Sequence, residues 1–113
     1  MSEPAAIHTD LAAGRWQEFS LAEQLGNIGS EVGRALRAKR QRNDRRMWGA
    51  LDRALELVDL TIANQTDAGR RRELCRAREV VCDLIVGDNQ YASTPESLEA
   101  YFMQFAIAAR LHR

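Results

Sequence analysis

The chain has 113 residues, 45% of them hydrophobic and 28% charged, and its 16 cationic and 16 anionic side chains balance to a net charge of zero. This composition fits one globular domain with its own core and excludes wholesale disorder. The sequence lacks an apolar run of the roughly 20 residues that span a bilayer, a signal-peptide pattern and a disulfide framework, so we expect a cytoplasmic protein.

The predicted domain is a helical bundle over residues 16–113. An N-terminal tail over residues 1–15 precedes it, in which apolar residues show no sustained periodicity. The first helix begins after Ser20, which forms a capping-box pattern with Glu23. We expect this helix to fray near residues 40–42. Its apolar residues recur at spacings of three and four, which places them on one face: Leu21, Leu25, Ile28, Val32 and Leu36.

The second and third helices are expected on either side of a short polar link. Asn43 or Asp44 caps the second helix, and residues 64–66 close it. Its apolar stripe consists of Met47, Leu51, Leu55, Val58 and Ile62. Asp67 caps the third helix, and Gly87 stands where a C-terminal stop is usual. The inward residues of this helix are Leu74, Ala77, Val81, Leu84 and Ile85.

The fourth helix has the strongest start signal in the chain. Thr94 is a hydroxyl cap, Pro95 takes the first helical position and Glu96 adds an acid to the first turn. The helix is defined by Leu98, Phe102, Phe105 and Ala109. Because the links between the four helices are short, neighbouring helices should be antiparallel. The sequence therefore predicts a single all-α, up-down-up-down four-helix bundle.

The fourth helix is also apolar nearly all round, since Gln104 is the only plainly polar residue between Tyr101 and Ala109. Such a helix needs burial on more sides than three partner helices provide. One interpretation is a tightly packed monomer whose edges are shielded by the segment around Trp16. The other is a homo-oligomer, in the form of a ring, that buries the fourth or second helix between subunits. We expect the oligomer, with an interface formed by Tyr101, Phe102, Met103, Phe105 and Ile107.

Three glycines interrupt the first helix, namely Gly26, Gly29 and Gly33. Each costs up to about 1 kcal/mol relative to alanine, so a compensating contact is expected. Close approach of another helix backbone would provide it. A phosphate-binding loop is rejected because the glycine spacing fits neither the dinucleotide motif nor the P-loop, and no strand precedes it.

The sequence offers no constellation of catalytic residues. The two histidines, His8 and His112, lie near the chain ends, and the Glu-x-x-His pairs of a di-metal bundle are missing. Cys75 and Cys82 are seven residues apart on one helix, about 10 Å along its axis, which is too far for a disulfide or a zinc knuckle. We therefore predict a protein that is not an enzyme, with no catalytic residues, metal, cofactor or small-molecule substrate.

The two thiols allow two interpretations. They share a helical stripe with Arg71 and Arg78, whose charge could lower a thiol pKa and create a redox-sensitive cysteine. The interpretation we prefer is that they are buried or boundary thiols that act as small hydrophobic groups.

Polar residues inside the bundle are expected to be structural. Asp52, Glu56 and Asp59 line one side of the second helix and should face arginines of the third helix, namely Arg71, Arg72 or Arg76. In the first helix, Asn27 and Glu31 are expected to be buried and to anchor a hydrogen-bond network.

Positive charge is concentrated in the middle of the chain. Residues 34–78 hold 13 Lys or Arg against 6 Asp or Glu, and 15 of the 16 cations in the chain are arginine. Arginine suits bidentate contact with phosphate. The cations around the first interhelix turn predict a nucleic-acid-binding end that contacts phosphates without reading sequence: Arg34, Arg37, Lys39, Arg40, Arg42, Arg45 and Arg46. The alternative is a solvated turn with interhelix salt bridges.

Four stretches resemble known proteins, and they lie at residues 16–21, 25–34, 53–62 and 101–110. They are similar to small prokaryotic four-helix-bundle proteins of unknown function. More distantly, they resemble the ribosomal-RNA intervening-sequence proteins and the accessory variability determinants of diversity-generating retroelements. The clearest match is the step from Asn27 to Ile28 among small residues. The chain departs from the retroelement proteins in its zero net charge, because those proteins are strongly basic.

The resemblance implies a pentameric barrel of four-helix bundles that binds a reverse transcriptase and nucleic acid through basic surfaces. Together with the charge pattern, it predicts a non-catalytic, homo-oligomeric adaptor for RNA, DNA or a nucleic-acid enzyme, with no membrane partner. A protein-interaction or scaffolding module without nucleic-acid binding is the second hypothesis.

Overall fold

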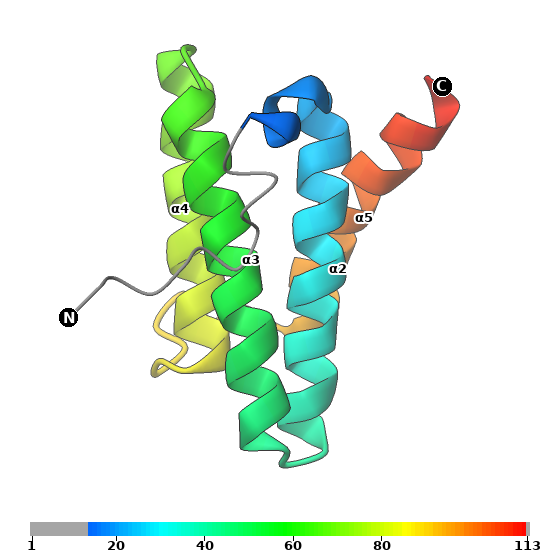
Figure 1. The fold of residues 1–113 in the computed structure, drawn as a ribbon. Helices are drawn as coiled ribbons and strands as arrows, with labels where there is room; N and C mark the ends of the chain where they lie inside the picture. The colour runs from blue at the N-terminus through cyan, green and yellow to red at the C-terminus, as the bar shows by residue number, and fades with distance from the viewer. Residues whose placement is uncertain (1–13, 113) are drawn as a thin grey trace, which may run out of the picture.

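The structure is a computed structural model that describes residues 14–112, so most of the predicted tail lies outside the described part (Figure 1). The described residues form helices and no strands, which confirms the all-α prediction. A short 3₁₀ helix comes first, and four long helices follow: η1 (Arg15–Glu18), α2 (Leu21–Arg40), α3 (Asp44–Asn64), α4 (Ala68–Ile85) and α5 (Pro95–Leu111).

Polar side chains fix the starts of the four long helices. Ser20 accepts a hydrogen bond from the Glu23 backbone N–H, and the Glu23 carboxylate accepts one from the Ser20 N–H, which confirms the predicted capping box. The other three helices begin after side-chain caps that accept from the N–H three residues later. These caps are Asn43, Asp67 and Thr94.

The turn between α2 and α3 contains Arg42 in the left-handed conformation, with φ of 56°. The Asn43 N–H donates to the Ala38 carbonyl at 2.9 Å, a bond that closes the end of α2 as in a Schellman motif. Glycine usually takes the left-handed position in this motif. The turn therefore places an arginine at the tip of the molecule where glycine would be the unstrained choice.

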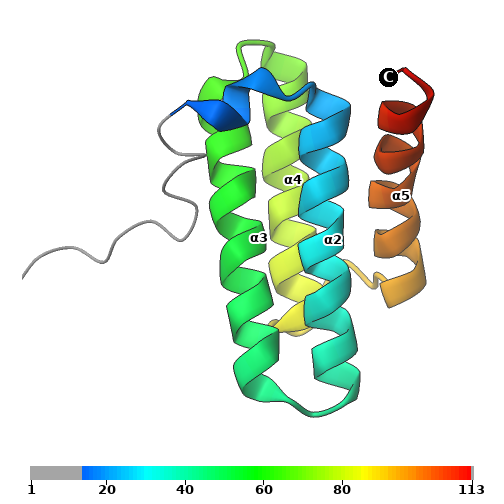
Figure 2. The same ribbon diagram turned by 45° about the vertical axis from the view of Figure 1, so that its right-hand side comes forward.

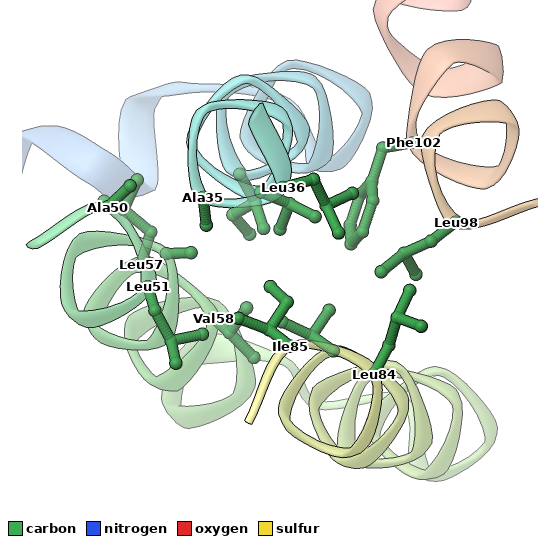
Figure 3. Close-up of a cluster of buried hydrophobic side chains, with 14 of the residues drawn as sticks. Ala35, Leu36, Ala50, Leu51, Leu57, Val58, Leu84, Ile85, Leu98 and Phe102 are labelled. Atoms are coloured by element: carbon green, nitrogen blue, oxygen red, sulfur yellow. The ribbon is translucent and has the colours of Figure 1, made fainter. Parts of the chain in front are cut away.

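Helix α2 lies at the centre of the arrangement. Its start lies beside the end of α3, because the η1 residue Gln17, just before α2, donates to Asn64. Its end lies beside the end of α4, because Lys39 donates to the Leu84 and Ile85 carbonyls. Helix α5 packs against α2 from the other side and stands at the edge of the molecule (Figure 2). The hydrophobic core lies between the four helices (Figure 3).

Two of the three glycines in α2 meet α5 at close range. A Cβ atom at Gly26 would stand 3.2 Å from the Ala106 Cα, and one at Gly29 would overlap the Cβ of Phe102. At Gly33 the nearest atom outside the local backbone would be a guanidinium nitrogen of Arg37, at 3.7 Å. The predicted close helix approach is therefore confirmed for Gly26 and Gly29, and it is wrong for Gly33.

The segment before α2 closes one end of the core. Trp16 is 2% exposed, and its indole N–H donates to the Thr61 hydroxyl at 2.9 Å. Thr61 in turn donates to the Leu57 carbonyl, and the Gln24 amide donates to the Trp16 carbonyl at 2.8 Å. Each of the buried side chains Trp16, Thr61 and Gln24 therefore forms a hydrogen bond at this end of the core.

Two predictions about polar residues of the helices are wrong. Asn27 is exposed rather than buried, because it lies on the side of α2 away from the core. Asp59 pairs with Arg78, at 2.8 Å, and not with Arg71, Arg72 or Arg76. The mismatch is one of helix register, since Arg78 is the arginine of α4 that comes level with Asp59.

Candidate nucleic-acid interface

Five arginines from two helices surround one hollow on the outer side of the α2–α3 pair. Arg34 and Arg37 project from α2, and Arg45, Arg46 and Arg53 project from α3. The hollow has a volume of about 900 Å³. Its remaining lining residues are uncharged: Ala38, Gln41, Asn43, Gly49 and Ala50. The predicted cationic end therefore contains a concave surface lined by arginines and by no carboxylate, which we call the arginine hollow.

The five arginines differ in how far they are already neutralised. Glu31, whose side chain is 13% exposed, accepts from Arg34 at 2.7 Å and from Arg53 at 3.0 Å. Arg37, Arg45 and Arg46 form no ion pair within residues 14–112. These three guanidinium groups keep all their hydrogen-bond donors for an external anion, and such a group can hold a phosphate oxygen pair bidentately.

Lys39 does not belong to this surface, although the sequence predicted it as a nucleic-acid-binding residue. Its ammonium group donates to the carbonyl oxygens of Leu84 and Ile85, both at 2.8 Å. These carbonyls lie at the C-terminal end of α4, where the helix leaves acceptors unpaired and where the dipole favours a cation. Lys39 therefore ties the end of α2 to the end of α4.

We expect Lys39→Met to lower the free energy of unfolding by about 1–2 kcal/mol, because it removes two charge-assisted hydrogen bonds to otherwise unpaired carbonyls. Urea unfolding followed by circular dichroism measures this loss. Arg40→Met is the matched control, since Arg40 is exposed and forms no ion pair within the described helices. Equal stability of the two variants would contradict the structural role of Lys39.

The two remaining predicted cations, Arg40 and Arg42, are exposed but do not line the arginine hollow. They flank it at the turn. In contrast, Arg53 lines the hollow and was not among the predicted binding residues. It lies seven residues after Arg46, about two helical turns along the same face of α3, so the helical period could have included it.

The predicted oligomer interface divides into buried and exposed residues. Phe102 is 3% exposed and packs in the core of its own chain, so it leaves little surface for contact with a second copy. Tyr101 is half-buried, and its hydroxyl donates to Glu73 at 2.9 Å. Phe105 is also half-buried, with its ring centroid 5.4 Å from that of Tyr101. Met103 and Ile107 are exposed on the outer side of α5.

The two thiols differ from each other. Cys75 is exposed, so the prediction that both are buried or boundary groups is wrong for this residue. Cys82 is half-buried, and burial raises the pKa of its thiol because the uncharged form is favoured away from water. The charge of Arg78 opposes that shift without cancelling it. The alternative interpretation, in which Arg78 lowers the thiol pKa, therefore does not hold for Cys82.

Within residues 14–112, no three His, Cys, Asp or Glu side chains gather where they could hold a metal ion. None of the helices in this range combines the length and the apolar character that crossing a membrane requires. Comparison with protein-family models gives no match, and comparison with curated proteins and with solved structures gives none either.

Proposed function

We propose that this protein is a non-catalytic, homo-oligomeric adaptor that binds nucleic acid or a nucleic-acid enzyme through the arginine hollow. The ligand recognised is the phosphate backbone of RNA or DNA. The observation that carries this proposal is the convergence of Arg37, Arg45 and Arg46, which form no ion pair within residues 14–112, on one concave surface. Three such cations near one another repel unless an anion joins them.

The shape of the site favours a backbone rather than a base. The hollow is lined by arginine, amide and small side chains, and no aromatic ring lines it. Trp48 is exposed on α3 but lies outside that lining. Stacking of unpaired bases needs aromatic faces. Arginines that contact phosphates give binding that ignores sequence and weakens as salt rises.

The proposal also includes the overall assembly. In it the chain is an up-down-up-down bundle, and several copies associate so that their hollows act together on one nucleic acid. Repeated weak sites on one polymer raise the overall affinity through effective concentration. The ring implied by the resemblance stays a prediction that the mass of the protein in solution tests.

The test is a titration of labelled duplex RNA and duplex DNA at several salt concentrations. We expect the triple variant Arg37→Gln, Arg45→Gln, Arg46→Gln to bind at least tenfold more weakly at low salt. We also expect the slope of log affinity against log salt to fall by about 2–3, since each lost phosphate contact removes about one unit. Both effects follow from the loss of three cations that contact phosphate.

A matched control removes the same number of arginines from elsewhere. Arg70, Arg71 and Arg72 are exposed at the start of α4, which lies at the end of the bundle opposite the α2–α3 turn (Figure 1). Their replacement by glutamine changes the net charge equally and should leave most of the affinity and the salt slope intact. Equal losses in the two triple variants would show attraction by net charge alone and would refute the proposed site. Absence of any binding by the wild type would favour the scaffolding module instead.

A further inference from the structure

Helix α5 carries a stripe of apolar side chains on the side away from the core. Met103 is 53% exposed, Ile107 is 45% exposed and Leu111 is 75% exposed. These residues are four apart, so they follow one another along a single face of the helix. Ala100 and Gln104 are also exposed and lie on the same side of the helix. We call these five residues the α5 stripe.

Within residues 14–112 no other helix packs over this stripe, and its edge at Met103 borders a groove that α5 shares with α2. Helix α5 packs through Phe102 and Ala106 against the glycines of α2, on the face opposite Ile107. Its outer side looks away from the bundle, and none of the other described helices stands there (Figure 2). Three exposed large apolar side chains in a row exceed the scattered hydrophobic groups of an ordinary surface and are typical of an interface.

Charges at the two ends of the stripe indicate what covers it. Glu99 and Arg110 are both exposed, and neither forms an ion pair within residues 14–112. They are eleven residues apart, roughly three turns, so they flank the stripe on the same side of α5. One end of this flank is negative and the other is positive. Such a surface is complementary to a second copy of itself that is related by a 180° rotation.

We infer that α5 pairs with α5 of a second copy in an antiparallel arrangement about a two-fold axis near Gln104. This inference rests on the homo-oligomer of the proposed function and names its contact face, and it makes the assembly a closed dimer in place of the ring that the resemblance implies. In this register Glu99 of each copy lies opposite Arg110 of the other. In the apolar layers Met103 meets Ile107 of the second copy, and Leu111 meets the small side chain of Ala100. Every large exposed residue of the stripe is then covered.

The first test is the mass of the full chain by light scattering without nucleic acid. We expect the mass of two chains for the wild type and of one chain for the double variant Met103→Glu, Ile107→Glu. Since both side chains are exposed, helicity should not change. The control is Val86→Glu, which alters an exposed apolar residue outside α5 and should stay dimeric. A wild-type mass of one chain, or of more than two, overturns the inference, as does a dimeric double variant.

The second test concerns the charges. Glu99→Arg and Arg110→Glu each turn two attractive contacts of the dimer into repulsive ones, and each should raise the dimer dissociation constant about tenfold. The combined variant Glu99→Arg, Arg110→Glu restores complementarity and should regain the wild-type constant. A combined variant that is as weak as the single ones overturns the antiparallel pairing.

The third test fixes the orientation through crosslinking. In a background with Cys75→Ser and Cys82→Ser, Gln104→Cys lies near the two-fold axis and should form a disulfide between the two copies on oxidation. Glu96→Cys lies far from its counterpart in the antiparallel register and should not. Crosslinking of both variants would indicate a parallel pair and would overturn the inference.

These experiments separate the pairing from nucleic-acid binding. The α5 stripe and the arginine hollow share no residue. A monomeric wild type that still binds RNA would refute the pairing and keep the hollow as a binding site. A dimer that binds neither RNA nor DNA would support the pairing and refute the hollow as a binding site.

Discussion

Replacement of Phe102 by alanine is expected to lower the free energy of unfolding by about 3–5 kcal/mol. The Phe102 ring is 3% exposed and extends from α5 into the core, where the side chains of all four helices meet (Figure 3). Helix α5 has only one other fully buried side chain, Leu98, so little else holds it to the bundle. The measurement is urea unfolding of the purified variant followed by circular dichroism.

Trp48→Ala is the control for the Phe102 variant, because it also truncates an aromatic ring. Trp48 is 49% exposed on α3, so its loss should change stability by less than about 1 kcal/mol. A Phe102 variant that keeps wild-type stability but loses oligomeric mass would contradict the core position. It would support instead the interface role that the sequence predicted for this residue.

The second large effect is a contrast between two glycine-to-alanine changes in α2. Gly29→Ala should lower the free energy of unfolding by about 2–3 kcal/mol, because the new methyl group would overlap the Cβ of Phe102 and force α2 and α5 apart. Gly33→Ala should raise it by up to about 1 kcal/mol, because alanine favours the helix and would meet only the flexible end of Arg37.

Thermal and urea unfolding of the two variants side by side test this contrast, since both make the same chemical change in the same helix. The difference between them should approach 3–4 kcal/mol. Two variants of equal stability would mean that α5 does not pack on Gly29. Gly26→Ala should fall between them, because its methyl group would stand 3.2 Å from the Ala106 backbone.

The helix starts were predictable because they depend on residues close in sequence. Ser20 and Glu23 complete their capping box within one turn, and Thr94 accepts from Ser97 just as locally. Periodicity also identified the core, since the apolar stripe of α2 is buried from Leu25 to Leu36. Such signals need only the helical repeat, so they are read reliably from one sequence.

Contacts between helices were less predictable because they depend on rotation and register. The partner of Asp59 was expected among three arginines and proved to be Arg78. Asn27 was expected inside and lies outside. Phe102 sits within a helix that is apolar nearly all round, so composition could not separate its inner face from its outer one. A helix of this kind has no distinct apolar face in its sequence. Only the packing of the neighbouring helices determines which of its side chains are buried.

The sequence predicted the region of the candidate site but not which side chains line it. Charge density identified the turn between α2 and α3, and four of the seven predicted cations line the arginine hollow. Charge counting treats all cations alike. It therefore included Lys39, whose ammonium group is already engaged with α4, and it omitted Arg53, which belongs to the hollow.

Lys39 is the only lysine of the chain, so it carries the only side-chain amine. Where reagents that acylate amines, such as activated esters used for dyes, crosslinkers and sensor surfaces, modify a side chain of this protein, they therefore modify the group that joins the ends of α2 and α4. A derivative made in this way would lose that junction before any experiment began. Dyes and surface linkers for this protein are better attached through the exposed thiol of Cys75.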